Sequence, residues 1–546
     1  MDILGIDILT FLILAPALGG LLVASLPANK WIARWTALGI GVGIFALSAW
    51  VFMDYQRVVA EVGGGFHLEA SYRWFTVLGA SWHVGVDGIS AAMVLLTGLL
   101  TPLAILISWE VEDRPNVHLA LLLLFETGSM GVFLSMDLMV FFLFYELSLV
   151  PMYFLINQWG SPAQKGVPYT GRLYASTKFM IYSIGGTLGM LLATQLIGFT
   201  AGTYEIAEIA SVGGAWLGLS GTEEAFLGLN IGFVKALAFI GFFVAFAIKV
   251  PIWPFHTWLP DAHGEAPTAG SMLLAGVMLK LGAYGFLRLV VPFFPDVWVS
   301  EIPIFGVTWA TMFAFLSMLG IVLGAFAAFG QNDIKRLVAY SSVNHMGFVG
   351  IGIAAFAMLY GEAWVAEQSA VAGAHMMDAL AATNGTVMQM FNHGLSSAGM
   401  FLLAGGIYHK THTRDLTQYG GFWVKAPIFG GMFIFMSMSS LGLPGLNGFV
   451  GEFLIVRGTW SVFTWLTAIS MIGLLFTGTY ILKGIRATLH GPFNMHWQDY
   501  NLEVDWREFT AVVVLGVFIF WTGLAPNWIL DTINASVTTI LTNIVG

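Results

Sequence analysis

Residues 242–255 read FFVAFAIKVPIWPF, an apolar run that contains one lysine and two prolines. Pro251 and Pro254 each remove a backbone N–H donor and clash with the preceding turn, so the helix that carries Lys249 is predicted to break just after it. A broken helix at membrane depth persists only where protein or a water-filled cavity satisfies the freed backbone groups. The stretch therefore predicts a membrane helix that is interrupted beside a buried charge.

Three further charges lie in apolar runs of the same kind. Glu146 lies in VFFLFYELSLVPMYFLI (140–156), Lys280 in LLAGVMLKLGAYGFL (273–287) and Glu452 in GLNGFVGEFLIV (445–456). A charge near the bilayer centre costs at least ~3 kcal/mol, so such residues are rare and usually functional. Two acids and two bases on four helices indicate a route for charge.

Composition places the whole chain in a membrane. Of its 546 residues, 58% are hydrophobic and 10% are charged, against about 25% charged residues in soluble domains. The chain has no cysteine, which excludes Cys-ligated iron–sulfur clusters, thiol catalysis and disulfides. Nucleotide-binding, nucleophile-elbow and nucleic-acid-binding motifs are absent from the sequence. No basic segment precedes the first apolar run, so we interpret that run as a span rather than a cleaved signal peptide.

Apolar stretches of about 20 residues or more predict an all-α polytopic protein with about fourteen transmembrane helices. They lie at 4–26, 31–53, 87–109, 117–135, 137–157, 176–199, 231–258, 266–291, 303–328, 333–359, 383–409, 426–457, 462–486 and 509–530. With the N-terminus outside, 14 Lys and Arg residues fall in the inner loops and 4 in the outer loops. This distribution predicts that both termini lie on the outer face.

A second interrupted helix is predicted at SLGLPGLNGFVGE (440–452), where Pro444 stands between glycines. Paired interruptions in two halves of a chain are typical of inverted repeats with sites near the midplane. The spacing predicts two inverted five-helix repeats, 117–291 (helices 4–8) and 303–486 (helices 9–13), with helices 7 and 12 broken. Residues 1–116 would form helices 1–3, and residues 487–546 a loop and helix 14.

Each buried charge also has a plain structural interpretation. Lys249 could snorkel from a helix end, and Lys280 could pair with a buried acid. Glu146 is the natural partner of Lys249, as a switchable pair or as a static salt bridge. Glu452, just past the second break, occupies the position symmetric with Lys249 and could donate or accept protons.

Two histidines fall inside predicted spans. His345 and His393 are suited to proton relay because the imidazole pKa lies near neutrality. Each could instead bond a backbone carbonyl, or the two could ligate haem. His263 lies in the loop after the first break, with acids nearby; a packing role is favoured there over a metal site.

Three other charged positions are ambiguous or local. Lys235 either marks an outer part of the path or snorkels. Asp137 is predicted to cap the fifth span at the positive end of the helix dipole. Glu126 lies mid-span and needs a partner that the sequence does not identify.

These motifs resemble a known family. The runs KVPIWPFHTWLPDAHGEAPTAGSMLLAGVMLKLGAYGFLR, DIKRLVAYSSVNHMGFV, NHGLSSAGMF and GLPGLNGFVGEF are similar to those of the antiporter-like subunits of respiratory complex I and the Mrp-type cation/proton antiporters. The resemblance covers about 100–530. Glu452 distinguishes this chain from the related chains L and N, which are expected to carry lysine there.

The resemblance implies a role for each buried group. Glu146 and Lys249 would form the pair of the first half-channel, and Lys280 would be the central lysine. His345 and His393 would connect it to Glu452 in the second half-channel.

The expected function is that of a proton-translocating membrane subunit of an NADH:quinone oxidoreductase in a bacterial inner membrane or an equivalent energy-coupling membrane. The resemblance implies that NADH, FMN, iron–sulfur clusters and quinone belong to partner subunits and that this chain holds no cofactor and no metal. The expected partners are other membrane subunits of the L and N type, the lipid bilayer and protons, without nucleic acid. The alternatives are a subunit of an Mrp-type antiporter or membrane-bound hydrogenase, and a haem-binding electron carrier.

Overall fold

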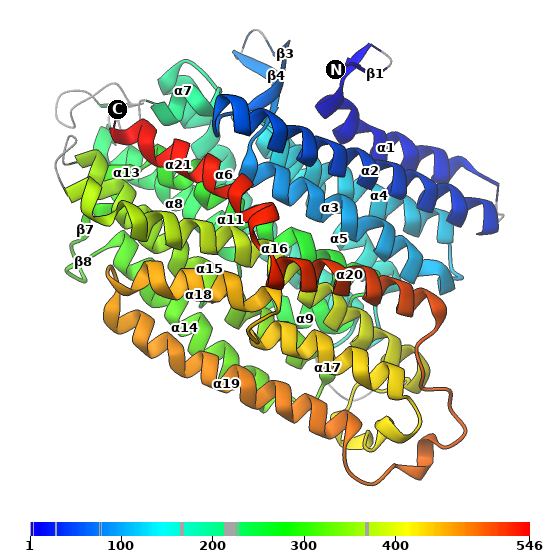
Figure 1. The fold of residues 1–546 in the computed structure, drawn as a ribbon. Helices are drawn as coiled ribbons and strands as arrows, with labels where there is room; N and C mark the ends of the chain where they lie inside the picture. The colour runs from blue at the N-terminus through cyan, green and yellow to red at the C-terminus, as the bar shows by residue number, and fades with distance from the viewer. Residues whose placement is uncertain are drawn as a thin grey trace.

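Long apolar helices lie side by side through most of the molecule (Figure 1). The structure is a computed structural model, and it describes every residue except 1, 4, 28–29, 76, 78, 164–168, 212–224, 227–228, 366–370 and 546. In the first half the long helices are α1 (Ile8–Ser25), α2 (Lys30–Val62), α3 (Gly88–Ile107), α4 (Pro115–Leu134), α5 (Leu138–Trp159), α6 (Arg172–Ala201) and α8 (Ile231–Lys249). In the second half they are α14 (Trp309–Gly330), α15 (Ile334–Val365), α16 (Val371–Thr411), α17 (Pro427–Leu441), α18 (Asn447–Trp460), α19 (Thr464–Leu489), α20 (Trp506–Leu524) and α21 (Asn527–Val545).

The predicted all-α membrane fold is confirmed. Among the described residues, twelve helices are long and apolar enough to cross a membrane. Two further predicted spans fall on α16 and on the pair α17 and α18. Large apolar side chains on the outer helices are exposed, for example Leu192 at 71% and Leu475 at 72%, as expected for surfaces that face lipid. The protein is therefore an integral membrane protein, and the number fourteen stays a prediction.

Both predicted helix interruptions are present. Helix α8 ends at Lys249 and the chain continues as turns until α9 (Trp258–Glu265) begins. Helix α17 ends at Leu441, where Gly442 adopts a positive φ of 77° as the C-cap, and α18 starts at Asn447. Such a backbone conformation favours glycine because it has no Cβ. Each buried charge of the interrupted helices thus lies within a few residues of unwound backbone.

The eighth predicted span is a rod (268–293) whose apolar window is wholly buried. It comprises α10 (Thr268–Leu273), a π-helical turn (Leu274–Met278), α11 (Leu279–Gly285), a second π-helical turn (Phe286–Val290) and α12 (Val291–Phe293). A Cβ on Gly276 would meet the Leu100 side chain of α3 at 2.4 Å, and a Cβ on Gly394 of α16 would meet the Gly276 carbonyl oxygen at 3.0 Å. Close glycine contacts therefore hold the rod between α3 and α16.

Small extramembrane elements complete the chain. The largest is an antiparallel hairpin of β3 (His67–Phe75) and β4 (Ala80–Val86), on the side of the bundle where the N-terminus lies (Figure 1). The short elements are β1 (Asp2–Ile3), β2 (Ile6–Asp7), α7 (Ile206–Ser211), β5 (Ala225–Phe226), β6 (Leu229–Asn230), α13 (Pro295–Val299), β7 (Glu301–Ile302) and β8 (Val307–Thr308). The hairpin and α21 had no counterpart among the predicted elements. The interpretation that the last helix reaches residue 530 differs from the structure, where α20 ends at 524 and α21 follows Pro526.

Candidate functional site

The first two site residues lie on neighbouring helices without a direct ion pair. Glu146 is on α5, and Lys249 is the last residue of α8. Among the described residues no ion pair joins them, and neither the Lys249 Nζ nor the Glu146 Oε1 has a hydrogen-bond partner. The Lys249 Nζ lies 4.9 Å from the ring centroid of Tyr145, and Glu146 acts on Lys249 electrostatically. Lys249 thus contacts the face of the Tyr145 ring, and it interacts with the Glu146 carboxylate without a hydrogen bond to it.

Lys280 occupies the α-helical segment between the two π-helical turns of the rod. It is fully buried. Its Nζ donates to the Ala275 carbonyl at 2.5 Å and lies 2.8 Å from the Nδ1 of His393. A π-helical turn shifts the backbone register by one residue and is frequent at functional sites. The Ala275 carbonyl that accepts from the lysine head group belongs to the first of these turns.

The second half of the site continues from the His393 ring. Its centroid is 5.7 Å from that of His345 on α15. The His345 Nδ1 lies 2.8 Å from the Glu452 Oε1 on α18. The same carboxylate oxygen accepts from the Gln389 Nε2 at 3.0 Å, and the Tyr480 hydroxyl is 3.4 Å from the His345 Nε2. Polar side chains from the rod, α16, α15 and α18 therefore form one sequence of close contacts from Lys280 to Glu452.

A further buried imidazole lies near this sequence of contacts. His263 on α9 is fully buried and stacks on Phe401, with centroids 4.3 Å apart and ring planes 8° from parallel. Neither of its ring nitrogens has a hydrogen-bond partner among the described residues. Lys335, near the start of α15, and Lys280 of the rod both act on it electrostatically.

The segment around His263 carries a network of ion pairs. Asp261 binds Lys178 at 2.7 Å and Arg336 at 2.5 Å. Arg414 binds Glu265 at 3.2 Å and Asp333 at 3.1 Å. Within the described ranges no group of three His, Cys, Asp or Glu side chains could hold a metal ion. The network connects α9 to α6, to α15 and to the segment that follows α16.

The other ambiguous charges are also placed by the structure. Asp137 caps α5, as predicted, by accepting from the N–H groups of Met139 and Val140. Lys235, near the start of α8, binds Asp296 at 2.5 Å. Glu126 is fully buried on α4, apart from the contact sequence that joins Lys280 to Glu452.

Outside the membrane, the β3–β4 hairpin carries a titratable cluster. The His83 Nδ1 lies 2.6 Å from the Glu205 Oε2, and its Nε2 lies 3.4 Å from the Glu69 Oε2. The hydrogen bond to Glu205 raises the pKa of His83 above 6.5. Burial acts to raise the pKa of Glu205, yet its bonds from His83 and Ser81 hold that pKa below 4.5. The cluster connects the hairpin to the segment that precedes α7.

Sequence reasoning identified the charged groups but missed their neutral neighbours. Gln389, Tyr145 and Tyr480 are polar or amphipathic residues that membrane helices often carry, so their type gives little signal. The i, i+4 spacing of Gln389 and His393 on one helix face was the available clue. The π-helical turns have no comparable signature in the sequence.

Comparison with known proteins places this geometry in context. Residues 135–367 and 368–477 match the family described as NADH:quinone oxidoreductase/Mrp antiporter, transmembrane. The chain is 39% identical to NADH-quinone oxidoreductase subunit M of Pseudomonas aeruginosa over 97% of this chain and 96% of that protein. It is 37% identical to the subunit of the same name from Escherichia coli, over 97% of each.

Solved structures share the fold. A chain of respiratory complex I from Thermus thermophilus superposes with a TM-score of 0.80 at 24% identity, covering 98% of this chain and all of that one. A chain of the Mrp complex from Dietzia superposes with a TM-score of 0.76 at 18% identity, covering 98% of this chain and 99% of that one.

Proposed function

The chain belongs to the NADH:quinone oxidoreductase/Mrp antiporter family of membrane subunits, and from that premise we propose that it translocates protons within an NADH:quinone oxidoreductase. Its relatives of similar length are subunit M of that enzyme. Among the branches of the family, the glutamate at Glu452 supports the subunit M type. The chain is thus a subunit of an enzyme complex and carries no redox chemistry of its own.

The observation that carries the proposal is the sequence of contacts from Lys280 to Glu452. Two of its links are 2.8 Å long, from Lys280 to His393 and from His345 to Glu452. The third link joins two imidazole rings 5.7 Å apart, a gap that one water molecule can bridge. Lysine, histidine and glutamate can each hold or release a proton, so the path can carry a proton through the middle of the bundle.

Glu146 and Lys249 control the entry to this path. The two groups are close enough to interact but are not bonded. A shift of either side chain changes how strongly the carboxylate holds the lysine charge. A Cβ on Gly282 would meet the Lys249 Cβ at 2.7 Å, so the lysine packs directly against the rod that carries Lys280. A movement of Lys249 relative to Glu146 therefore displaces the rod and, with it, Lys280.

The proton enters from the inner face. His263 lies within electrostatic range of both Lys335 and Lys280. Its two ring nitrogens, which have no hydrogen-bond partner among the described residues, suit it to pass a proton toward Lys280. The proton then moves through His393 and His345 to Glu452 and leaves toward the outer face, where both termini lie. Residues 117–291 and 303–486 act as the two repeats that hold the two half-channels.

Energy for this movement comes from outside the chain. Moving one charge against the membrane potential costs ~2.3 kcal/mol per 100 mV, and the chain has no cysteine to hold an iron–sulfur cluster. Partner subunits therefore supply NADH oxidation, FMN, the iron–sulfur clusters and quinone reduction. Other antiporter-like subunits of the L and N type pack against the bundle in the membrane and transmit that energy.

The proposal is tested with Lys249→Ala in the assembled complex. Inverted membrane vesicles are supplied with NADH, and acidification is followed by quenching of a pH-sensitive dye. Ferricyanide reduction, which needs only the partner subunits, confirms assembly. Lys30→Ala, which removes a lysine that pairs with Glu112 at the surface, is the matched control.

Loss of pumping in Lys249→Ala with normal ferricyanide reduction supports the proposal, and wild-type pumping in that variant would refute it. The alternative functions give different results. Dependence of the signal on Na⁺ in place of protons would indicate cation/proton exchange. A Soret band in the purified chain would indicate haem at the histidine pair.

A further inference from the structure

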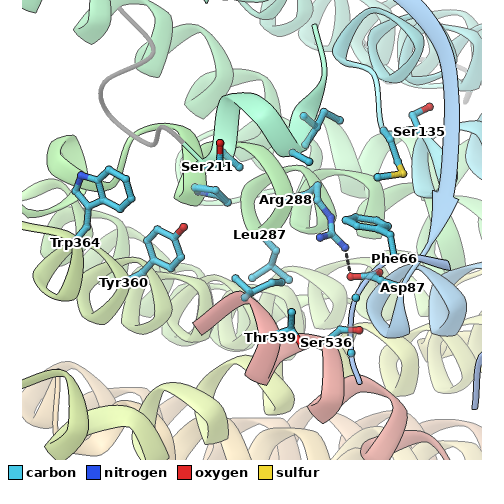
Figure 2. A pocket seen from close by; sticks show the side chains of 18 residues that line it. Phe66, Asp87, Ser135, Ser211, Leu287, Arg288, Tyr360, Trp364, Ser536 and Thr539 are labelled. Carbon is cyan, nitrogen blue, oxygen red and sulfur yellow. Dashed lines mark hydrogen bonds and ion pairs between the residues drawn. The ribbon is translucent and has the colours of Figure 1, made fainter. Parts of the chain in front are cut away.

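A cavity of about 430 Å³ lies at the end of the bundle that holds the β3–β4 hairpin and the last helix (Figure 2). Its wall combines segments that are far apart in the sequence. They include Phe66 before the hairpin, Leu287 of the second π-helical turn, Tyr360 near the end of α15, and Ser536 and Thr539 of α21. The proposed topology places this end of the molecule at the outer face. The cavity therefore lies toward the outer side.

A buried ion pair lines this cavity. Arg288 and Asp87 are hydrogen-bonded through Nη2 and Oδ2, and their side chains are only 8% and 3% exposed (Figure 2). The Arg288 guanidinium lies over the Phe66 ring, 4.8 Å from its centroid, and 5.4 Å from that of Tyr284. The other Asp87 oxygen accepts from the Ser90 N–H at 2.9 Å, as the N-cap of α3. The guanidinium is thus held in place by one carboxylate and two aromatic rings.

The arginine of this pair belongs to the same rod as the central lysine. Arg288 and Lys280 belong to the same rod, eight residues apart, which corresponds to about 12 Å along a helix axis. Tyr284 lies midway between them, and its hydroxyl donates to the Phe133 carbonyl at 3.0 Å. Along the rod, Tyr284 therefore lies between Lys280 and Arg288, the residue that lines the cavity.

We propose that Arg288 and Asp87 seal the outer cavity and prevent protons from exchanging directly between Lys280 and the outer side. This inference rests on the proposed function, because it presupposes that Lys280 carries a translocated proton. A fixed arginine next to an aqueous passage is a barrier to protons and other cations. Without such a barrier, a proton on Lys280 would have a short exit that bypasses His393, His345 and Glu452.

The two partners have different tasks. Arg288 supplies the positive charge that repels a cation entering from the cavity. Asp87 positions the guanidinium, and the positive end of the α3 dipole offsets part of the carboxylate charge. Stability alone does not account for the pair, because a buried ion pair is often no more stable than apolar residues of the same size.

The seal can be tested by thiol accessibility, because the chain has no native cysteine. A cysteine is placed between Lys280 and the seal by Ala283→Cys, at a fully buried position, in the assembled complex in membranes. Small cationic and anionic methanethiosulfonate reagents are added from the outer side. Modification is measured on this chain's own gel band, and the rate is compared in three backgrounds: native, Arg288→Lys, and the neutral double variant Asp87→Asn with Arg288→Gln.

With the seal intact or with Arg288→Lys, the cationic reagent reacts slowly. In the neutral background its rate rises at least about fivefold, the effect of one unit charge 4 Å away even at the dielectric constant of water. The anionic reagent changes less. Leu287→Cys, in the cavity wall itself, reacts in every background and shows that the reagents reach the cavity.

Equal cationic rates in the native and neutral backgrounds would overturn the inference. An equal acceleration of both reagents would also overturn it, because that result indicates general loosening and not a charge barrier. If Ala283→Cys fails to assemble, Leu281→Cys, two residues earlier and fully buried, gives the same comparison. Pumping in Lys249→Ala decides the proposed function separately, so the seal can fail while proton translocation stands.

Discussion

A single methyl group added at Gly282 is expected to uncouple this protein. Gly282 lies on α11, two residues after Lys280, where the rod touches the end of α8. A Cβ built there would lie 2.7 Å from the Lys249 Cβ and 3.0 Å from both the Phe246 carbonyl oxygen and the Val250 side chain. Ordinary contacts begin at 3.4 Å. Gly282→Ala must therefore push α11 away from Lys249 or bend the end of α8.

The magnitude follows from this geometry. Overpacking of a filled core costs about 1–3 kcal/mol, and replacing glycine by alanine in a helix returns about 1 kcal/mol. The net loss of stability is therefore small, and the subunit should assemble. Function is more sensitive, because a misplacement of about 1 Å can reduce a positioned reaction step by about 10²-fold. We expect proton pumping below a tenth of the wild-type rate.

The assay separates these two effects. NADH-driven acidification of inverted vesicles measures pumping, and ferricyanide reduction measures the amount of assembled complex. Gly185→Ala is the matched control, because a Cβ at that position of α6 meets nothing within 4 Å. Wild-type pumping by an assembled Gly282→Ala complex would refute the claim that contact between Lys249 and the rod transmits the change.

Three other perturbations probe different parts of the molecule. Glu452→Gln keeps the shape of the side chain but removes the charge beside the histidine ring 2.8 Å away, so pumping should fall while the surface control Glu110→Gln is unaffected; equal pumping in the two would exclude Glu452 from the path. The pKa of His83 is raised in the folded protein, so protonated His83 stabilises the hairpin through its ion pairs. This contribution is at most about 1 kcal/mol. It is fully present below pH 6.5 and disappears as the pH rises through the higher folded-state pKa. In the wild-type protein, amide hydrogen exchange in strands β3 and β4 should accordingly speed up between pH 6 and pH 9 by more than the intrinsic exchange rate does. In His83→Gln it should rise only as the intrinsic rate does. Gly442→Ala places a side chain on a backbone with a φ of 77° and should lower the stability by about 1–2 kcal/mol, measured as the thermal midpoint of the complex. Gly431→Ala on α17 should leave the midpoint unchanged, because a Cβ there meets nothing within 4 Å.

The buried charged residues of the site could be predicted from the sequence alone. Glu146, Lys249, Lys280 and Glu452 were recognisable because a charge in an apolar run is costly, and that cost is visible without any coordinates. The helix breaks were recognisable for a similar local reason, since proline and glycine change the backbone at their own positions. The caps followed the same logic, as the confirmed cap at Asp137 shows.

Other features needed contacts between distant segments. The hairpin was missed because its strands lie in a stretch that was interpreted only as a loop between spans. Helix α21 was missed because its polar residues hide a helix that packs against α3 and α16. The neutral residues of the site were missed because nothing about a single glutamine or tyrosine indicates which carboxylate or imidazole it will contact.

The sequence by itself determined that the chain lies in a membrane. It also determined where two of the helices break and which charged side chains are buried despite the energetic cost. These are properties of single residues and short segments in an apolar solvent. Only the tertiary structure decided the order of those side chains: Lys280 beside His393, His345 beside Glu452, and Lys249 near Glu146 but not bonded to it. That order depends on helix packing set by glycine contacts and π-helical turns, because a shift of one residue along a helix turns a side chain about 100° away from its partner.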